Sequence, residues 1–97
     1  MKASVEKIEL EGKSFLGIRV ELPEAPLLLI TAPKGYLMCG YLNLETADKL
    51  KQAAVVVRGV KNLEEMLNAE IVEVSQKCAE LGVKPGCRGR EALLTMS

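Results

Sequence analysis

The chain has 97 residues, of which 48% are hydrophobic and 27% charged, a size and composition typical of one folded domain. Its 13 basic residues balance its 13 acidic ones, and only three residues are aromatic. A long-range positive field and the rings that stack on bases are therefore both missing, so we expect no nucleic-acid partner and no membrane partner. The absence of histidine excludes Ser-His-Asp and Cys-His catalytic arrangements and any zinc site that needs an imidazole.

Apolar segments and cysteines indicate where the protein resides. No segment approaches the roughly 20 apolar residues needed to cross a bilayer, and the N-terminus lacks a signal-peptide core. The three cysteines, Cys39, Cys78 and Cys87, cannot all pair with one another and lack the dense spacing of a disulfide scaffold. We therefore expect reduced thiols and a cytoplasmic location.

The first half of the chain has the pattern of strands. Alternating apolar and polar residues predict strands over residues 5–10 and 15–22, joined by a tight turn at 11–14 into an antiparallel hairpin. Two prolines then precede residues 27–32, which are apolar on both faces and must be covered on both sides, by helices or by another subunit. A turn separates them from a fourth strand over residues 36–42.

Helical spacing dominates the second half. Asn43 is a suitable N-cap for a first helix, and Asn62, followed three residues later by a glutamate, for a second. Between them, residues 55–57 form a β-branched run that predicts a fifth strand, parallel to the fourth because a helix connects the two. Apolar residues repeat over 71–81 at steps of three and four and predict a third helix, and residues 90–96 predict a short last one.

This element order predicts an α+β fold in which a small mixed sheet, with antiparallel hairpins at its N-terminal end, is accompanied by three to four C-terminal helices. Residues 1–97 then form a single α+β domain. A hairpin and a two-sided apolar strand would leave exposed edges and apolar surface on a monomer. We therefore expect residues 15–30 to supply much of a subunit interface.

Several short segments, taken together, point to a family. They are residues 35–40 (GYLMCG) followed by 42–43 (LN), then 58–60 (RGV), 82–86 (GVKPG) and 89–94 (GREALL). In their order and spacing the chain resembles the YunC-like family of small bacterial and archaeal domains of unknown function.

The resemblance implies an α+β fold whose N-terminal β region, about residues 5–42, mediates assembly into a homo-oligomer, namely a tetramer. It implies no reaction and no catalytic residues, because the family has no established activity.

Cys39 is the first candidate site residue. It lies on the predicted fourth strand, beside a glycine that permits close approach of another backbone or a ligand, which suits a nucleophile or redox thiol. Activation without histidine would have to come from Lys34, from an arginine, or from the helix starting near Asn43. The alternative is that Cys39 is a small buried hydrophobe, as Cys78 is expected to be in its helix.

The loop before the last helix is a candidate anion site. Gly86 and Gly89 free backbone N–H groups near a helix start, and Arg88 and Arg90 supply guanidinium groups for a carboxylate or phosphate. The alternative is a flexible turn whose solvated arginines pair with Glu91.

Arg58 directly follows the predicted fifth strand, where open α/β sheets often place ligands. If strands four and five are parallel neighbours, Arg58 lies at the same pocket as Cys39 and Asn43. The alternative is an ion pair between Arg58 and Glu64 or Glu65.

Two function classes remain open at this point. The first is a homo-oligomeric domain that binds a small ligand or a protein partner without catalysis. The second is a small thiol-dependent enzyme that uses Cys39 with Arg58 or Arg88 as the anion-binding element. Acidic residues are spread over helix surfaces with no His or Cys cluster beside them, so we predict no metal site and identify no cofactor.

Overall fold

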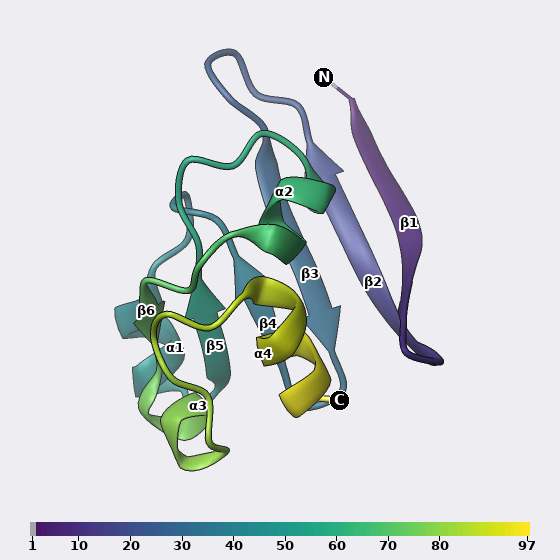
Figure 1. The fold of residues 1–97 in the computed structure, drawn as a ribbon. Coiled ribbons are helices and arrows are strands. Elements are labelled where there is room, and N and C mark those ends of the chain that lie inside the picture. Colours follow the sequence, from purple (N-terminus) through teal and green to yellow (C-terminus); the bar gives the residue numbers. More distant parts are fainter. Residues whose placement is uncertain (1) are drawn as a thin grey trace.

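Within residues 2–97, six strands form one mixed sheet in the order β1-β2-β3-β4-β5-β6 (Figure 1). The structure is a computed structural model and describes residues 2–97. The fold is α+β with antiparallel N-terminal strands, which confirms the predicted fold class. The strands are β1 Ala3–Leu10, β2 Lys13–Val20, β3 Leu27–Ala32, β4 Gly35–Met38, β5 Ala53–Val56 and β6 Glu73–Val74.

The connections explain the strand directions. β1 and β2 are joined by a two-residue turn in which Glu11 and Gly12 have φ values of 48° and 80°, the left-handed conformation that matches the twist of a hairpin. Short loops also make β2–β3 and β3–β4 antiparallel. A helix lies between β4 and β5, and these two strands are parallel, as predicted.

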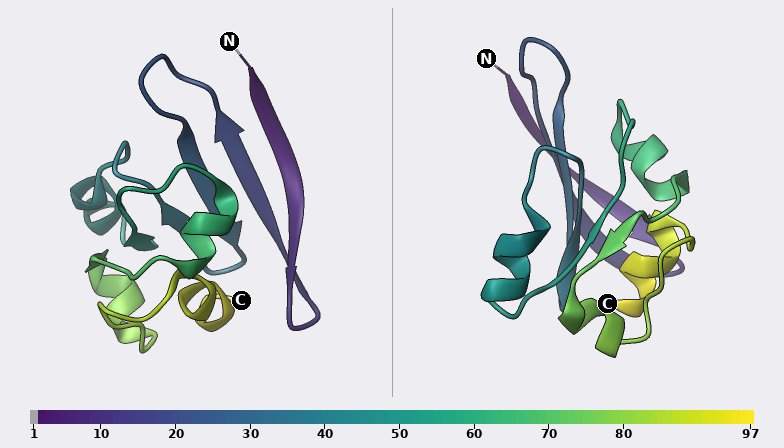
Figure 2. Two further views of the ribbon diagram at one scale, coloured as in Figure 1. Left: turned by 45° about the horizontal axis from the view of Figure 1, so that its top comes forward. Right: turned by 90° about the vertical axis from the view of Figure 1, so that its left-hand side faces the viewer.

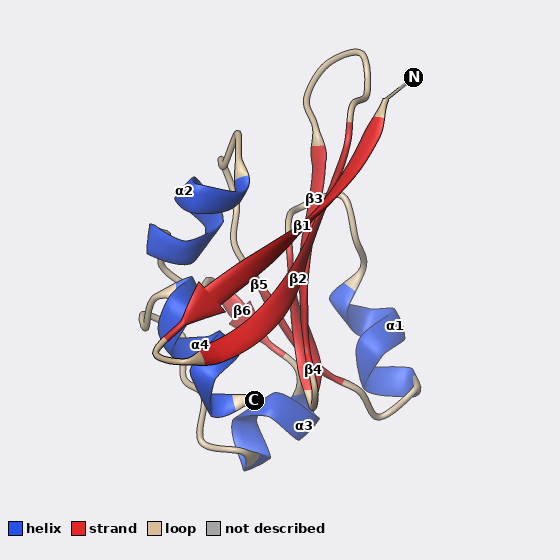
Figure 3. Cartoon of the chain, turned by 90° about the vertical axis from the view of Figure 1, so that its right-hand side faces the viewer, coloured by secondary structure: helices blue, strands red, loops and turns tan. Residues whose placement is uncertain are grey.

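Helices cover the two faces unequally. α1 (Leu44–Lys49) lies alone on one face, while α2 (Leu63–Asn68), α3 (Gln76–Glu80) and α4 (Gly89–Thr95) lie on the other (Figures 2 and 3). Asn43 and Asn62 are the N-caps of α1 and α2, as predicted, and their side-chain oxygens accept the N–H groups of Glu45 and Glu65. None of the helices within residues 2–97 combines the length and apolar character needed to cross a membrane.

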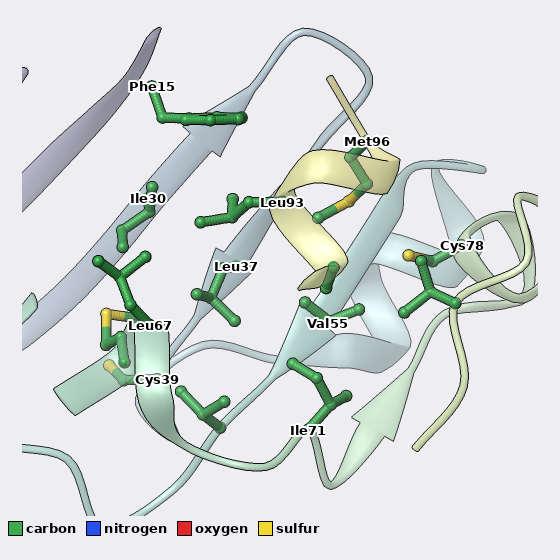
Figure 4. Packing of buried hydrophobic residues seen from close by; sticks show 14 of the residues in the cluster. Phe15, Ile30, Leu37, Cys39, Val55, Leu67, Ile71, Cys78, Leu93 and Met96 are labelled. Carbon is green, nitrogen blue, oxygen red and sulfur yellow. The ribbon is translucent and has the colours of Figure 1, made fainter. Parts of the chain in front are cut away.

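The main core fills the space between the sheet and the three-helix face (Figure 4). Leu28 and Ile30 of β3 point into it and are fully buried. A smaller cluster lies under α1, where Met38 and Ala47 are buried and Leu29 is half-buried. The two-sided strand predicted at residues 27–32 is thus covered on both faces within one chain, although less completely on the α1 side.

The helix predicted over residues 71–81 begins only at Gln76, and its first part is the edge strand β6. Ser75 is the reason. It is fully buried, its hydroxyl donates to the carbonyl of Gln52 at 2.8 Å, and its oxygen accepts from the N–H groups of Ala54 and Cys78 at 2.9 and 3.3 Å. Ser75 therefore caps α3 and holds it on β5.

Gly89 is a packing glycine at the crossing of α4 and α2. A Cβ atom built there would meet the carbonyl oxygen of Met66 and would lie 3.0 Å from Leu37 Cδ2. We predict that Gly89→Ala lowers the free energy of unfolding by about 1–3 kcal/mol, because the backbone contact leaves no room for a methyl group. Denaturant unfolding followed by circular dichroism measures the change.

Gly40→Ala is the matched control for that substitution. A Cβ at Gly40 has a flexible neighbour, with Arg58 Nη1 at 3.4 Å, so the change should stay within about 0.5 kcal/mol. Equal losses for the two variants would contradict the packing role of Gly89.

Candidate functional site

The carboxyl ends of β4 and β5 meet at one edge of the sheet, because these two strands are parallel neighbours. Ligands of open α/β sheets bind in this position. Here the loops that follow the two strands surround a hollow of about 280 Å³. Its lining consists of Ala25, Pro26, Cys39, Gly40, Tyr41, Gly59 and Val60.

Loops from three parts of the chain form the wall of the hollow. The Tyr41 hydroxyl donates a hydrogen bond to the carbonyl oxygen of Ala25 at 2.9 Å. This bond ties the loop after β4 to the loop between β2 and β3. Pro26 and Val60 add apolar surface on either side, so the wall is mainly apolar.

Cys39 belongs both to the hollow and to the core. Only 5% of the residue is exposed, and it packs in the main core cluster with Leu67 (Figure 4). Its N–H donates to the carbonyl of Leu28 at 3.2 Å, and its sulfur accepts the N–H of Leu28 at 3.3 Å. The side chain is therefore held in one orientation, with the residue at the inner wall of the hollow.

Arg58 lies at the rim and forms an ion pair with Glu73 of β6. The alternative considered from sequence was an ion pair with Glu64 or Glu65, and the observed partner is Glu73 instead. The Arg58 side chain is 58% exposed and passes over Gly40, a residue that lines the hollow.

Asn43 adjoins the same region. It lines a second hollow of about 420 Å³ together with Gly40, Tyr41 and Arg58. Its side-chain oxygen accepts the N–H of Glu45 at 2.8 Å and is used as the cap of α1. Cys39 thus lines the first hollow, whereas Asn43 and Arg58 line the second, and the two hollows share Gly40 and Tyr41.

The two arginines of the loop before α4 converge on Asn68 at the end of α2. The Arg88 guanidinium donates to the backbone oxygen of Asn68, and Arg90 Nη2 donates to its side-chain oxygen at 3.0 Å. The Arg88 N–H is taken by a carboxylate oxygen of Glu91 at 2.8 Å. These contacts fix α4 to α2.

The two glycines of this loop also have partners within the chain. Gly86 has a φ of 96°, and its N–H donates to the carbonyl of Ile71 at 2.9 Å. The N–H of Gly89 donates to Ala69 at 3.0 Å. The groups considered as an anion cradle are therefore engaged in packing contacts between the helices.

The other two cysteines carry raised pKa values. Burial raises the pKa of the Cys78 thiol to about 11, with a smaller contribution from the nearby Cys87 thiol. Burial also raises the pKa of Cys87. Both are neutral thiols at pH 7, and neither lies at the hollow.

Sequence reasoning missed Tyr41, Val60, Glu73 and the segment Ala25-Pro26. Val60 follows Arg58 closely, so its place after a buried strand was a usable signal. Ala25 and Pro26 come from a hairpin loop distant in sequence, and no local pattern places them near Cys39.

We predict that Cys39→Ala costs about 1–3 kcal/mol of unfolding free energy, because the buried N–H of Leu28 loses the acceptor it has in the sulfur. Cys39→Ser should cost less, since a hydroxyl oxygen also accepts this bond. Denaturant unfolding of both variants checks the order, and a serine variant less stable than the alanine variant would contradict it.

Three findings relate this chain to other proteins. A family model described as "Domain of unknown function (DUF1805)" matches residues 38–96. The uncharacterized protein YunC of Bacillus subtilis (strain 168) is 36% identical over an alignment of 93 residues, which covers 92% of this chain and 92% of YunC. The crystal structure of a protein of unknown function from Thermoplasma acidophilum, TA1206, is 42% identical, with a TM-score of 0.94 over 99% of this chain and 94% of that chain.

Proposed function

The chain belongs to the DUF1805 family, and from that premise we propose that it is a homo-oligomeric module that binds a small ligand at the carboxyl ends of β4 and β5 without catalysis. One observation carries this proposal, the mainly apolar hollow of about 280 Å³ between the loops after these strands. Among the described residues, only Cys39 and Tyr41 of its lining carry an exchangeable side-chain proton. A wall of this kind is suited to holding a molecule rather than to acid-base chemistry.

The α1 side of the N-terminal strands supports assembly. Val5 of β1 and Leu16 of β2 are 63% and 42% exposed, and Ile18, paired with Val5, is half-buried. These side chains share one face of the sheet, and the single helix on that side lies beyond them over β4 and β5 (Figure 3). A second copy of this chain would cover this exposed apolar surface.

The free edge of β1 supports a second contact. The N–H of Glu21 donates to the carbonyl of Lys2, so the even-numbered residues of β1 turn their backbone groups toward β2. The odd-numbered ones, including Lys7 and Glu9, turn theirs to the open edge. An antiparallel copy related by a two-fold axis at Ile8 would place Lys7 opposite Glu9 of the partner subunit, an attractive cross-strand pair.

A face and an edge are two different surfaces, and each is complementary to itself under a two-fold axis. Two such interfaces generate a closed tetramer with D2 symmetry. We therefore propose a tetramer assembled through the N-terminal β region, the state that the family resemblance implies.

Leu16→Lys tests the assembly. It is expected to convert the tetramer into a smaller species, because a charge replaces an apolar side chain at the proposed contact. Size-exclusion chromatography with light scattering measures the mass. Val72→Lys is the matched control. Val72 is 47% exposed and directly precedes β6, the edge strand opposite β1, so this variant should leave the mass unchanged. A monomeric parent protein, or two variants of equal mass, would refute the assembly.

Native mass spectrometry of protein purified gently from its own host tests ligand binding. We expect an oligomer with excess mass, which is lost in Ala25→Trp because an indole fills the hollow. Lys34→Trp, at the opposite end of β4, serves as control and should keep the excess mass. Excess mass retained in Ala25→Trp would place the ligand elsewhere.

A thiol-dependent enzyme is the second candidate, favoured by the position of Cys39 at the inner wall of the hollow. A reactive thiolate would be alkylated by iodoacetamide at neutral pH faster than Cys39 in the unfolded chain. Slower alkylation would count against the enzyme and agree with a buried thiol.

A further inference from the structure

We infer that the ligand of the hollow is a small organic monocarboxylate, whose apolar part lies against Pro26 and Val60 and whose carboxylate binds Arg58. This inference rests on the proposed function and specifies its ligand class. Three features of the site carry it: the size and character of the hollow, the donors beside it, and the charges around its rim.

The hollow determines the body of the ligand. A volume of about 280 Å³ lies just below the usual range for drug-sized ligands, which favours a small molecule. The ring of Tyr41 and the side chains of Pro26 and Val60 give an apolar wall. The Tyr41 hydroxyl is already bonded to Ala25, which leaves the ring itself as the available surface.

Hydrogen-bond donors indicate an anionic end. Arg58 Nη1 approaches Gly40, a residue of the lining, while Nη2 pairs with Glu73. Within residues 2–97 the backbone N–H groups of Gly40, Gly59 and Val60, all in the lining, have no acceptor. A carboxylate accepts from a guanidinium through two parallel bonds and from backbone N–H groups with its remaining lone pairs.

The charges at the rim favour a ligand that carries a single negative charge. Arg58 lines the two hollows that adjoin this one, and their walls also carry Glu45, Glu64, Glu65 and Glu73. Carboxylates in the walls that Arg58 also lines repel a multiply charged anion such as phosphate more strongly than a monocarboxylate.

Glu73 is the competitor that the ligand displaces. Both side chains of the Arg58–Glu73 pair are about half exposed, 58% and 47%, and exposed ion pairs contribute little stability. Exchange of Glu73 for a ligand carboxylate at Arg58 therefore needs little free energy. Removing the charge of Glu73 should strengthen binding of the carboxylate.

Benzoate and benzamide form the probe pair that tests the inference, because they share shape and differ in charge. Amide chemical-shift titrations by NMR should show saturable benzoate binding at millimolar concentration, with the shifts at Gly40, Gly59 and Val60, and weaker binding of benzamide. Arg58→Gln should weaken the binding of benzoate by about tenfold and leave the binding of benzamide unchanged. Glu73→Gln should strengthen the binding of benzoate.

Lys13→Gln is the control, since it also removes a positive charge from a side chain bonded within the chain, where Lys13 Nζ donates to Ser97 Oγ at 2.8 Å, and Lys13 is not part of the lining of the hollow. It should change neither titration. Equal binding of the two probes with no effect of Arg58→Gln would overturn the carboxylate inference and leave ligand binding intact. Shifts from neither probe would overturn both, and tighter binding of inorganic phosphate than of benzoate would overturn the choice of a monoanion.

Discussion

The parallel pairing of β4 with β5 is the constraint on which the candidate site depends. The N–H of Val57 donates to the carbonyl of Met38 at 3.0 Å, just beyond the two strands, and keeps their carboxyl ends side by side. The loops that carry Cys39 and Arg58 leave the sheet from these ends. Without the crossover through α1, the same two strands could be joined as a hairpin, and their loops would emerge at opposite edges.

Ser75 secures the other side of this arrangement. A buried hydroxyl with partners on β5, on the segment before it and on α3 fixes how the chain returns after β6. The same anchor holds the end of β6 on β5 and so keeps Glu73, two residues before Ser75, beside Arg58. The charge environment of the rim therefore depends on a serine in the core. A buried polar group whose hydrogen bonds are all made specifies one arrangement of the chain, because any other arrangement would leave at least one buried donor or acceptor unpaired.

Local patterns predicted most of the fold. Glu11-Gly12, Asn43 and Asn62 act within a few residues of themselves, and the turn and both helix caps were predicted. The strand within residues 71–81 was not predicted, because the apolar spacing of this segment suits a helix. The long-range hydrogen bonds of Ser75 decide against a helix that starts before Gln76. Glu73 was missed as the partner of Arg58 for the same reason, since a strand at Glu73 is needed to bring the two side chains together. Ala25 lines the hollow because of a tertiary contact with Tyr41, which no short stretch of sequence contains.

Strand β3 is bonded to Cys39 at the inner wall of the hollow and has side chains on both faces of the sheet. Leu28 exchanges two hydrogen bonds with Cys39, while Leu29 faces the α1 side, as Ile18, its neighbour across the ladder, also does. A shift of this strand that opens the hollow must also move the surface proposed for subunit contact. The proposed ligand binding and the proposed assembly would then be thermodynamically linked, and each would change the free energy of the other by the same amount.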